Sequence, residues 1–202
     1  MQLQLVYGSK KSFLTGITAG YLMIEPRDPT ENGRINQKTV NSYNLQWFGM
    51  AKLGNLTINT KATYGTNMSQ YVMLGGYARL ADDSTAMGNF EYTPYKVYSV
   101  YADFGYKLSE NLDAGLFAGY TENMGTEDKL MSGTIQARGA KIMNIYRVAP
   151  RITYTSGPLR FGLEYAYNAA AYGDGDPDEY GVYDKTNEAI NHRIMLAAKF
   201  TF

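Results

Sequence analysis

Residues 191–202 read NHRIMLAAKFTF, and taken at every second position their side chains fall into two sets that differ in polarity. One set of alternate positions is mainly apolar and ends on a phenylalanine: His192, Ile194, Leu196, Ala198, Phe200 and Phe202. The other set contains Arg193 and Lys199. A period of two is typical of a β-strand and not of a helix. Because chain ends in water usually carry polar residues and fray, this pattern predicts a terminal strand whose apolar face contacts something other than water.

The same period recurs along most of the chain. It is clear in NLTINTKATY (55–64), KVYSVYADFGYKL (96–108) and LRFGLEYAYNA (159–169). None of these segments has the three- and four-residue apolar spacing of an amphipathic helix. The sequence therefore predicts an all-β, antiparallel fold of about eleven strands in one domain, 1–202. The expected strands are 2–7, 12–24, 39–53, 55–65, 70–80, 85–93, 96–108, 110–122, 140–155, 158–171 and 190–202.

Composition excludes several classes of protein. The formal net charge is zero, so bulk charge does not indicate a nucleic-acid partner. Cysteine is absent, which excludes disulfides, cysteine-based zinc sites and thiol catalysis. The sequence has no run of 18 apolar residues, so it predicts no membrane-spanning helix. Residues 1–11 do not resemble a signal peptide. The mean hydropathy of −0.35 is nevertheless compatible with a transmembrane β-barrel, because alternating strands average to a polar value.

The connections between the expected strands fall into two populations that alternate along the chain. One population is short: 8–11, 54, 81–84, 109–110 and 156–157. The other contains long polar loops at 25–38, 123–139 and 172–188, together with two short members at 66–69 and 94–95. Outer-membrane barrels have tight periplasmic turns and long external loops, and their strands have similar lengths to those expected here. The pattern predicts an antiparallel transmembrane β-barrel.

Aromatic residues on the expected lipid face form two groups. Tyrosine is abundant, with 19 Tyr and 8 Phe against one Trp. Near the short turns lie Phe13, Tyr106, Tyr154, Phe161 and Phe202. Near the long loops lie Tyr21, Tyr43, Tyr64, Tyr92, Tyr98, Tyr120 and Tyr167. High strand propensity explains the abundance of tyrosine, but the two-belt placement is typical of the two membrane–water interfaces.

These features resemble Gram-negative outer-membrane β-barrels of the porin type over nearly the whole chain. The last strand resembles the C-terminal assembly signal of that class, carried here by Ile194, Leu196, Phe200 and Phe202. RFGLEYAYNAAAYG (160–173), followed by an acidic loop and NHRIMLAAKFTF, is similar to the ends of porin-like proteins of the Bacteroidetes. The resemblance implies an outer-membrane location, a lipid bilayer as partner, a channel function without an enzymatic step, and no cofactor.

The expected strand number is odd, whereas single-chain bacterial barrels have even numbers and both ends at the periplasm. We therefore expect the chain to be the C-terminal portion of a larger even-stranded barrel, lacking N-terminal strands. The alternative is a miscounted strand, and the segment 85–93 is the weakest. Pro150 lies inside an expected strand, where its missing N–H predicts a β-bulge.

The expected lumen-facing residues are mostly basic. Nine basic residues stand against the acids Glu91, Asp103, Asp113 and Glu164. Arginine and lysine in a pore favour anions. Four arginines from three consecutive strands predict a ladder on one wall, and the alternative is that these charges form structural ion pairs. The basic set is Lys52, Lys61, Arg79, Lys107, Arg147, Arg151, Arg160, Arg193 and Lys199.

Two other features give weaker signals. The loop 173–184 contains Asp174, Asp176, Asp178 and Glu179, but lacks the glycine of a calcium-binding EF-hand, so a solvated loop is expected. The single histidine, His192, is expected at the lipid interface with no serine on the neighbouring strand, so no catalytic residue and no metal site are predicted.

A stretch of small residues between 55 and 90 is a candidate subunit contact, because porins commonly form trimers. The residues are Thr60, Ala62, Gly76, Ala78, Ala86 and Gly88. A thin lipid contact, or packing against another part of the barrel, is equally consistent with them.

These features are consistent with two functions. The first is an outer-membrane channel for passive diffusion of small polar solutes, with a preference for anions. The second is a plugged structural or interaction barrel whose loops 123–139 and 172–188 bind a partner, with the inward side chains Tyr71, Tyr101 and Phe117 blocking the lumen.

Overall fold

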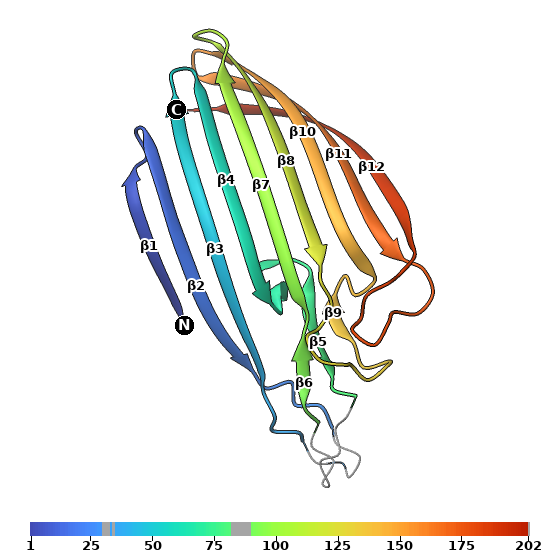
Figure 1. Ribbon diagram of the computed structural model, residues 1–202. Coiled ribbons are helices and arrows are strands. Elements are labelled where there is room, and N and C mark those ends of the chain that lie inside the picture. The colour runs from blue at the N-terminus through green and yellow to red at the C-terminus, as the bar shows by residue number, and fades with distance from the viewer. Residues whose placement is uncertain (30–32, 34, 82–89, 202) are drawn as a thin grey trace.

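The computed structural model describes residues 1–29, 33, 35–81 and 90–201 (Figure 1). A nine-stranded antiparallel sheet, here called the main sheet, has the order β1-β2-β3-β4-β7-β8-β10-β11-β12. No α-helix occurs in the described part of the chain, and no helix there is long and apolar enough to cross a membrane. The strands of the main sheet are β1 (Gln2–Ser9), β2 (Phe13–Ile24), β3 (Val40–Leu53), β4 (Leu56–Thr66), β7 (Lys96–Lys107), β8 (Leu112–Asn123), β10 (Ile142–Ser156), β11 (Leu159–Gly173) and β12 (Thr186–Phe200).

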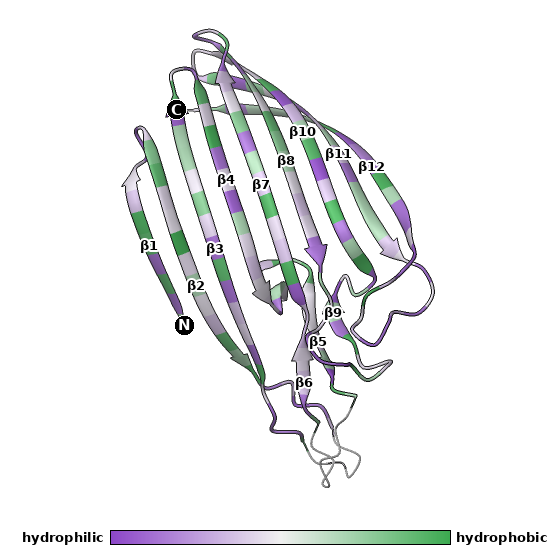
Figure 2. Cartoon of the chain, in the orientation of Figure 1, coloured by the Kyte–Doolittle hydropathy of each residue, from purple (hydrophilic) through white to green (hydrophobic). Residues whose placement is uncertain are grey.

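The main sheet is curved, and its two faces differ in chemistry. Hydropathy alternates along each strand, so that apolar residues share one face and polar residues share the other (Figure 2). Arg151 in β10 forms an ion pair with Asp103 in β7 across the intervening strand β8. The charged residues therefore share the concave face, here called the inner face, and the apolar residues share the convex outer face.

The prediction of an all-β antiparallel fold is confirmed. The sheet is open: β1 and β12 form its two edges and do not pair with each other. Every neighbouring pair within it is antiparallel, and the register is continuous over most of its length.

Two of the expected strands, 70–80 and 85–93, do not belong to the main sheet. β4 pairs directly with β7, from Leu56↔Tyr106 to Thr66↔Lys96, so 67–95 is one long connection. This connection contains the 3₁₀-helix η1 (Met68–Tyr71), β5 (Gly75–Arg79) and β6 (Tyr92–Pro94), while 82–89 lies outside the described residues. The left-handed backbone at Asn67 and the positive φ values of 128° and 152° at Gly75 and Gly76 turn the chain off the strand direction.

The long connections pack together into a structure that we call the cap. It comprises the described residues of 25–39, 67–95, 124–141 and 174–185, and it lies at the end of the sheet opposite the short turns (Figure 1). A second sheet of three strands runs through it in the order β6-β5-β9, where β9 is Gln136–Arg138. Ala78, Tyr95 and Leu130 form its buried core. Short turns and long connections still alternate along the main sheet, but the short turn expected at 81–84 is wrong, because this segment falls inside the connection 67–95. The connections expected at 66–69 and 94–95 belong to the two ends of that same connection.

Several residues that we expected on the barrel wall lie in the cap. The guanidinium of Arg79 forms an ion pair of 3.4 Å with Asp28 and lies 3.8 Å from the centre of the Phe90 ring. Glu91 pairs with Lys38 at 2.9 Å. Tyr92 is not in an aromatic belt: its hydroxyl donates to Asp28 and accepts from Asn36. Burial raises the pKa of Tyr92 to about 12, so the phenol stays neutral and can make both hydrogen bonds.

The predicted bulge at Pro150 is also wrong. The register against β11 is the same before and after this residue, at Val148↔Tyr167 and at Arg151↔Glu164. Against β8 the pairing runs straight through Pro150↔Leu116. On the β11 side the ladder omits Ala149 and Pro150 without a change of register, consistent with the missing N–H of proline. The register shift of β10 lies between Ile142 and Asn144 instead.

The small-residue face is divided between two parts of the molecule. Thr60 and Ala62 lie on the outer face of the main sheet, opposite Ala102 and Val100. Ala78, by contrast, is fully buried in the cap. A Cβ on Gly76 would overlap the β9 strand, so Gly76 is equally unavailable to a partner. Ala86 and Gly88 lie outside the described residues. The expected contact surface over 55–90 therefore does not exist as one face.

Asn36 is fully buried in the cap and joins two of its segments, 25–39 and 67–95, by hydrogen bonds. Its amide donates to the carbonyl of Phe90 at 2.8 Å and to Tyr92, and its oxygen accepts from the N–H of Lys38. We predict that Asn36→Ala weakens the cap by about 1–3 kcal/mol, because it leaves buried polar groups without partners. Hydrogen exchange should become faster in residues 90–95 and remain unchanged in β7 and β8. The exposed Asn187→Ala in β12 is the matched control and should change neither region.

Candidate functional site: the charged inner face

The structure places most of the predicted pore-lining residues on the inner face of the main sheet. They come from seven different strands and lie in rows that cross the sheet, such as Lys52–Thr57–Gly105–Gly115–Arg151–Glu164. The residues found on this face are Lys52, Lys61, Asp103, Lys107, Asp113, Arg147, Arg151, Arg160, Glu164, Arg193 and Lys199. Arg79 and Glu91 belong to the cap and not to this face.

Arg151 is held in place by a bidentate ion pair. Its two terminal nitrogens lie 2.6 and 3.0 Å from the two carboxylate oxygens of Asp103. The side chain crosses β8 at Gly115, where an added Cβ would lie 2.6 Å from Arg151 Cζ. The glycine is therefore required for the arginine to reach its partner. Both side chains are mostly buried, which strengthens the pair relative to an ion pair in water.

Arg147 makes the second close pair, with its Nη2 at 2.6 Å from Glu164 on β11. Its guanidinium also lies 5.8 Å from the centre of the Phe117 ring, which in turn packs against Tyr101 with 5.5 Å between ring centres. Tyr101 and Phe117 thus form an aromatic ridge on the inner face, next to the paired arginine.

Arg160 is paired more loosely. Its Nη2 lies 3.8 Å from Asp113, and both side chains are about half exposed. The three arginines 147, 151 and 160 therefore form ion pairs, as in the structural alternative to a free ladder. Glu164 pairs with Arg147 and not with Arg160, although Arg160 is on the same strand as Glu164.

The remaining basic residues of the inner face have no ion pair within the described part of the chain. They are Lys52, Lys61, Lys107, Arg193 and Lys199. Asp103, Asp113 and Glu164, the three predicted acids that the structure places on this face, are paired with arginine, so the excess positive charge resides on these five residues. The inner face is basic, but its positive charge is carried mainly by lysine and not by the arginine ladder.

The cap reaches onto the inner face near the long connections. Met68 and Leu74 pack against Val97 of β7, and Ile145 of β10 lies against the same cluster. The hydroxyl of Tyr71 accepts hydrogen bonds from Gln2 in β1 and Asn44 in β3. The segment 67–75 therefore lies across the inner side of the sheet and narrows the space there.

The outer face exposes large apolar side chains over nearly its whole area. Ile17, Leu163 and Leu196 are 50%, 44% and 82% exposed. Such a continuous apolar surface is unusual in water. Phe13, Tyr106, Tyr154 and Phe161 are exposed near the short turns. Near the cap, ring contacts link neighbouring strands in the pairs Tyr43–Tyr64, Tyr98–Tyr120, Tyr146–Tyr167 and Tyr167–His192.

The residues of the expected assembly signal lie on this outer face. Ile194 and Leu196 in β12 oppose Tyr165 and Leu163 in β11, and Phe200 opposes Leu159. Phe202 lies outside the described residues. Their role as a signal stays a prediction.

His192 and the acidic loop show no catalytic or metal-binding arrangement among the described residues. The hydroxyl of Tyr165 is 2.7 Å from His192 Nδ1, and the Tyr167 ring packs against the imidazole edge-on. Asp178 accepts from the backbone N–H groups of Tyr180 and Val182, so it stabilises its own turn. In the ranges that the structure describes, no group of acidic and histidine side chains could hold a metal ion.

The inner-face glycines were not predicted from the sequence. Gly105 and Gly115 follow the same period as the charged residues, so each leaves a space on the inner face. Their position in the two-residue period is the signal that could have identified them. The sequence does not show, however, that Arg151 fills the space at Gly115 while the space at Gly105 stays open, because this depends on the register of the strands.

The two kinds of arginine pair predict different coupling energies. In a double-mutant cycle with Arg151→Ala and Asp103→Ala, we expect about 1–3 kcal/mol of coupling in the free energy of unfolding, because the pair is bidentate and mostly buried. For Arg160→Ala with Asp113→Ala we expect less than about 1 kcal/mol, since that pair is long and exposed. Denaturant unfolding of the folded protein and its variants measures both coupling energies. Equal coupling energies would contradict the assignment.

Comparison with models of known protein families, with curated proteins and with solved structures finds no match to this chain.

Proposed function

We propose that the main sheet is part of the wall of an outer-membrane β-barrel of a Gram-negative bacterium, and that small polar solutes diffuse through it with a preference for anions. The outer face would contact lipid, and the inner face would line the aqueous path. The function requires no chemical step and no cofactor.

The exposed apolar outer face is the observation that carries this proposal. Leaving so many large apolar side chains in water would be unfavourable, at roughly 25 cal/mol per Å². In a bilayer the same face would contact the apolar hydrocarbon chains of the lipids. The aromatic residues near both ends of the strands fit the two interfaces, where tyrosine combines an apolar ring with a hydrated hydroxyl.

The charges of the inner face support the anion preference. Its acids are neutralised by arginines at distances of 2.6 to 3.8 Å. Five basic side chains stay without an acidic partner among the described residues. Lining groups of one sign raise the local concentration of the opposite ion, which is how charged rings select ions in pores.

The second candidate is a plugged barrel whose cap binds a partner. The observation in its favour is the segment 67–75, which crosses the inner face and hydrogen-bonds to β1 and β3 through Tyr71. The ridge of Tyr101 and Phe117 adds to the obstruction. This candidate predicts a membrane protein with the same fold and no ion conductance.

Electrical recording separates the two candidates. We expect the folded protein to give stepwise conductance in a planar bilayer, with a reversal potential in a KCl gradient that indicates a preference for chloride. Replacing Lys52, Lys61 and Lys107 together by glutamine should shift that potential towards potassium. A closed trace from correctly folded protein would reject the channel and favour the plugged barrel.

The lipid contact predicts that substitution by arginine costs much more at one residue of β11 than at the residue next to it. Leu163→Arg places a charge on the outer face and should destabilise the protein by about 2–4 kcal/mol in phosphatidylcholine vesicles. Gly162→Arg places the same charge on the inner face, where an added Cβ meets no atom within 4 Å, and should cost little. Equal losses in the free energy of unfolding would argue against lipid on the outer face.

A further inference from the structure

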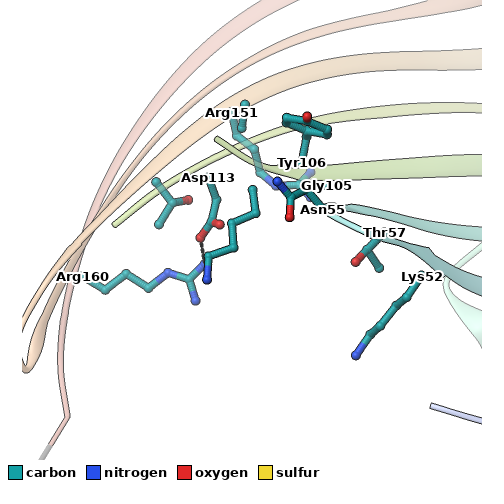
Figure 3. A pocket seen from close by; sticks show the side chains of 12 residues that line it. Lys52, Asn55, Thr57, Gly105, Tyr106, Asp113, Arg151 and Arg160 are labelled. Carbon is teal, nitrogen blue, oxygen red and sulfur yellow. Dashed lines mark ion pairs between the residues drawn. The ribbon is translucent and has the colours of Figure 1, made fainter. Parts of the chain in front are cut away.

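A hollow of about 380 Å³ opens on the inner face near the short turns (Figure 3). It is lined by the β3–β4 turn and by β7, β8, β10 and β11. Four of its lining residues are basic and one is acidic: Lys52, Lys107, Arg151, Arg160 and Asp113. Arg160 enters it from one side and Lys52 from the other (Figure 3).

The hollow exists because Gly105 has no side chain in a row of longer residues. The neighbouring inner-face glycine, Gly115, is covered by the guanidinium of Arg151. At Gly105 an added Cβ would meet only the carbonyl oxygen of Thr57, at 4.0 Å. The Arg151–Asp103 pair therefore uses one of the two glycine spaces and leaves the other open.

The charge around this space is strongly positive. Asp103 neutralises Arg151 through two hydrogen bonds, so this pair adds little net charge. Asp113 lies 3.8 Å from Arg160 and compensates it only in part. Neither ammonium group, of Lys52 or of Lys107, has an ion-pair partner in the part of the chain that the structure describes. The net charge of the lining is therefore close to that of two unpaired lysines.

The chemistry of the lining indicates the kind of ligand. Thr57, Thr153 and Asn55 add hydroxyl and amide groups to the cationic donors. Most of the side chains that line the hollow are polar, so they offer little apolar surface for the tail of an amphiphilic ligand. Two positive charges with several donors around a compact space match an oxyanion of charge −2, and lysine and arginine are the usual ligands of phosphate groups.

We propose that this hollow is a binding site for a phosphate group, either as inorganic phosphate or on a small phosphate monoester. The proposal deepens the proposed function, on which it rests for its setting, since it names the anion class held at the short-turn end of the path. Arg160 would bind phosphate in exchange for its long contact with Asp113, while the Arg151–Asp103 pair would keep its geometry.

Binding of inorganic phosphate to the folded protein in detergent micelles tests the site. Isothermal titration at low salt and pH 8, where phosphate is a dianion, should show saturable binding. Lys52→Gln and Lys107→Gln should each weaken it about ten-fold, as expected for the loss of one charge-assisted hydrogen bond. Lys61→Gln is the matched control: Lys61 is an unpaired lysine among the described residues of the same face that does not line the hollow, and its loss should change the affinity less than two-fold.

A second variant separates a defined site from diffuse attraction by the basic face. Gly105→Leu fills the hollow without changing any charge, and the open space at this position allows the side chain. We expect it to abolish phosphate binding. Wild-type affinity in this variant, or an equal effect of all three lysine substitutions, would overturn the proposal. Glycerol phosphate, titrated in parallel, shows whether the site accepts a monoester or free phosphate alone.

The channel and the site can fail independently. Saturable phosphate binding in a protein that gives no conductance would keep the site and reject the channel. Conductance in a protein that shows no saturable phosphate binding would keep the channel and reject the site.

Discussion

A strand that is hydrogen-bonded along both edges has only its two faces left for other contacts, and its residues must alternate between them. This constraint underlies the chemistry of the main sheet. The pairing Thr60↔Ala102 assigns the residues of β4 and β7 to the outer or the inner face, and the registers of the other neighbouring pairs assign the remaining strands of the main sheet in the same way. A slip of one residue in any strand would move its lysines and arginines to the apolar face and its leucines to the charged one.

Much of this arrangement could be predicted from the sequence, because alternation is a local signal. The strand faces, the antiparallel class and most of the inner-face charges follow from counting in twos. The connection 67–95 could not be predicted in this way, since its residues also alternate, and its departure from the sheet depends on backbone turns at Asn67 and Gly75. Arg79 and Tyr92 were misplaced for the same reason.

The partners of the charged residues were the other part that local pattern could not supply. A pair such as Arg151 and Asp103 joins strands that are not neighbours, so it depends on curvature and on the glycine between them. The sequence indicated a basic face, and the register shows which of its charges are compensated. Three arginines of the inner face form ion pairs between strands. The excess positive charge comes mainly from lysines that have no ion pair within the described part of the chain.

In this protein the long connections tolerate sequence changes less well than the short turns do. Long loops at the end of a sheet ordinarily accept insertions and sequence drift. Here the long connections contain buried side chains such as Asn36, Tyr95 and Leu130, which fix them to one another. The exposed turns at 108–111 and 157–158 carry no such side chains. Peptide epitopes or affinity tags inserted into this protein should therefore be tolerated at its short turns, and variation among descendants of this sequence should accumulate there first.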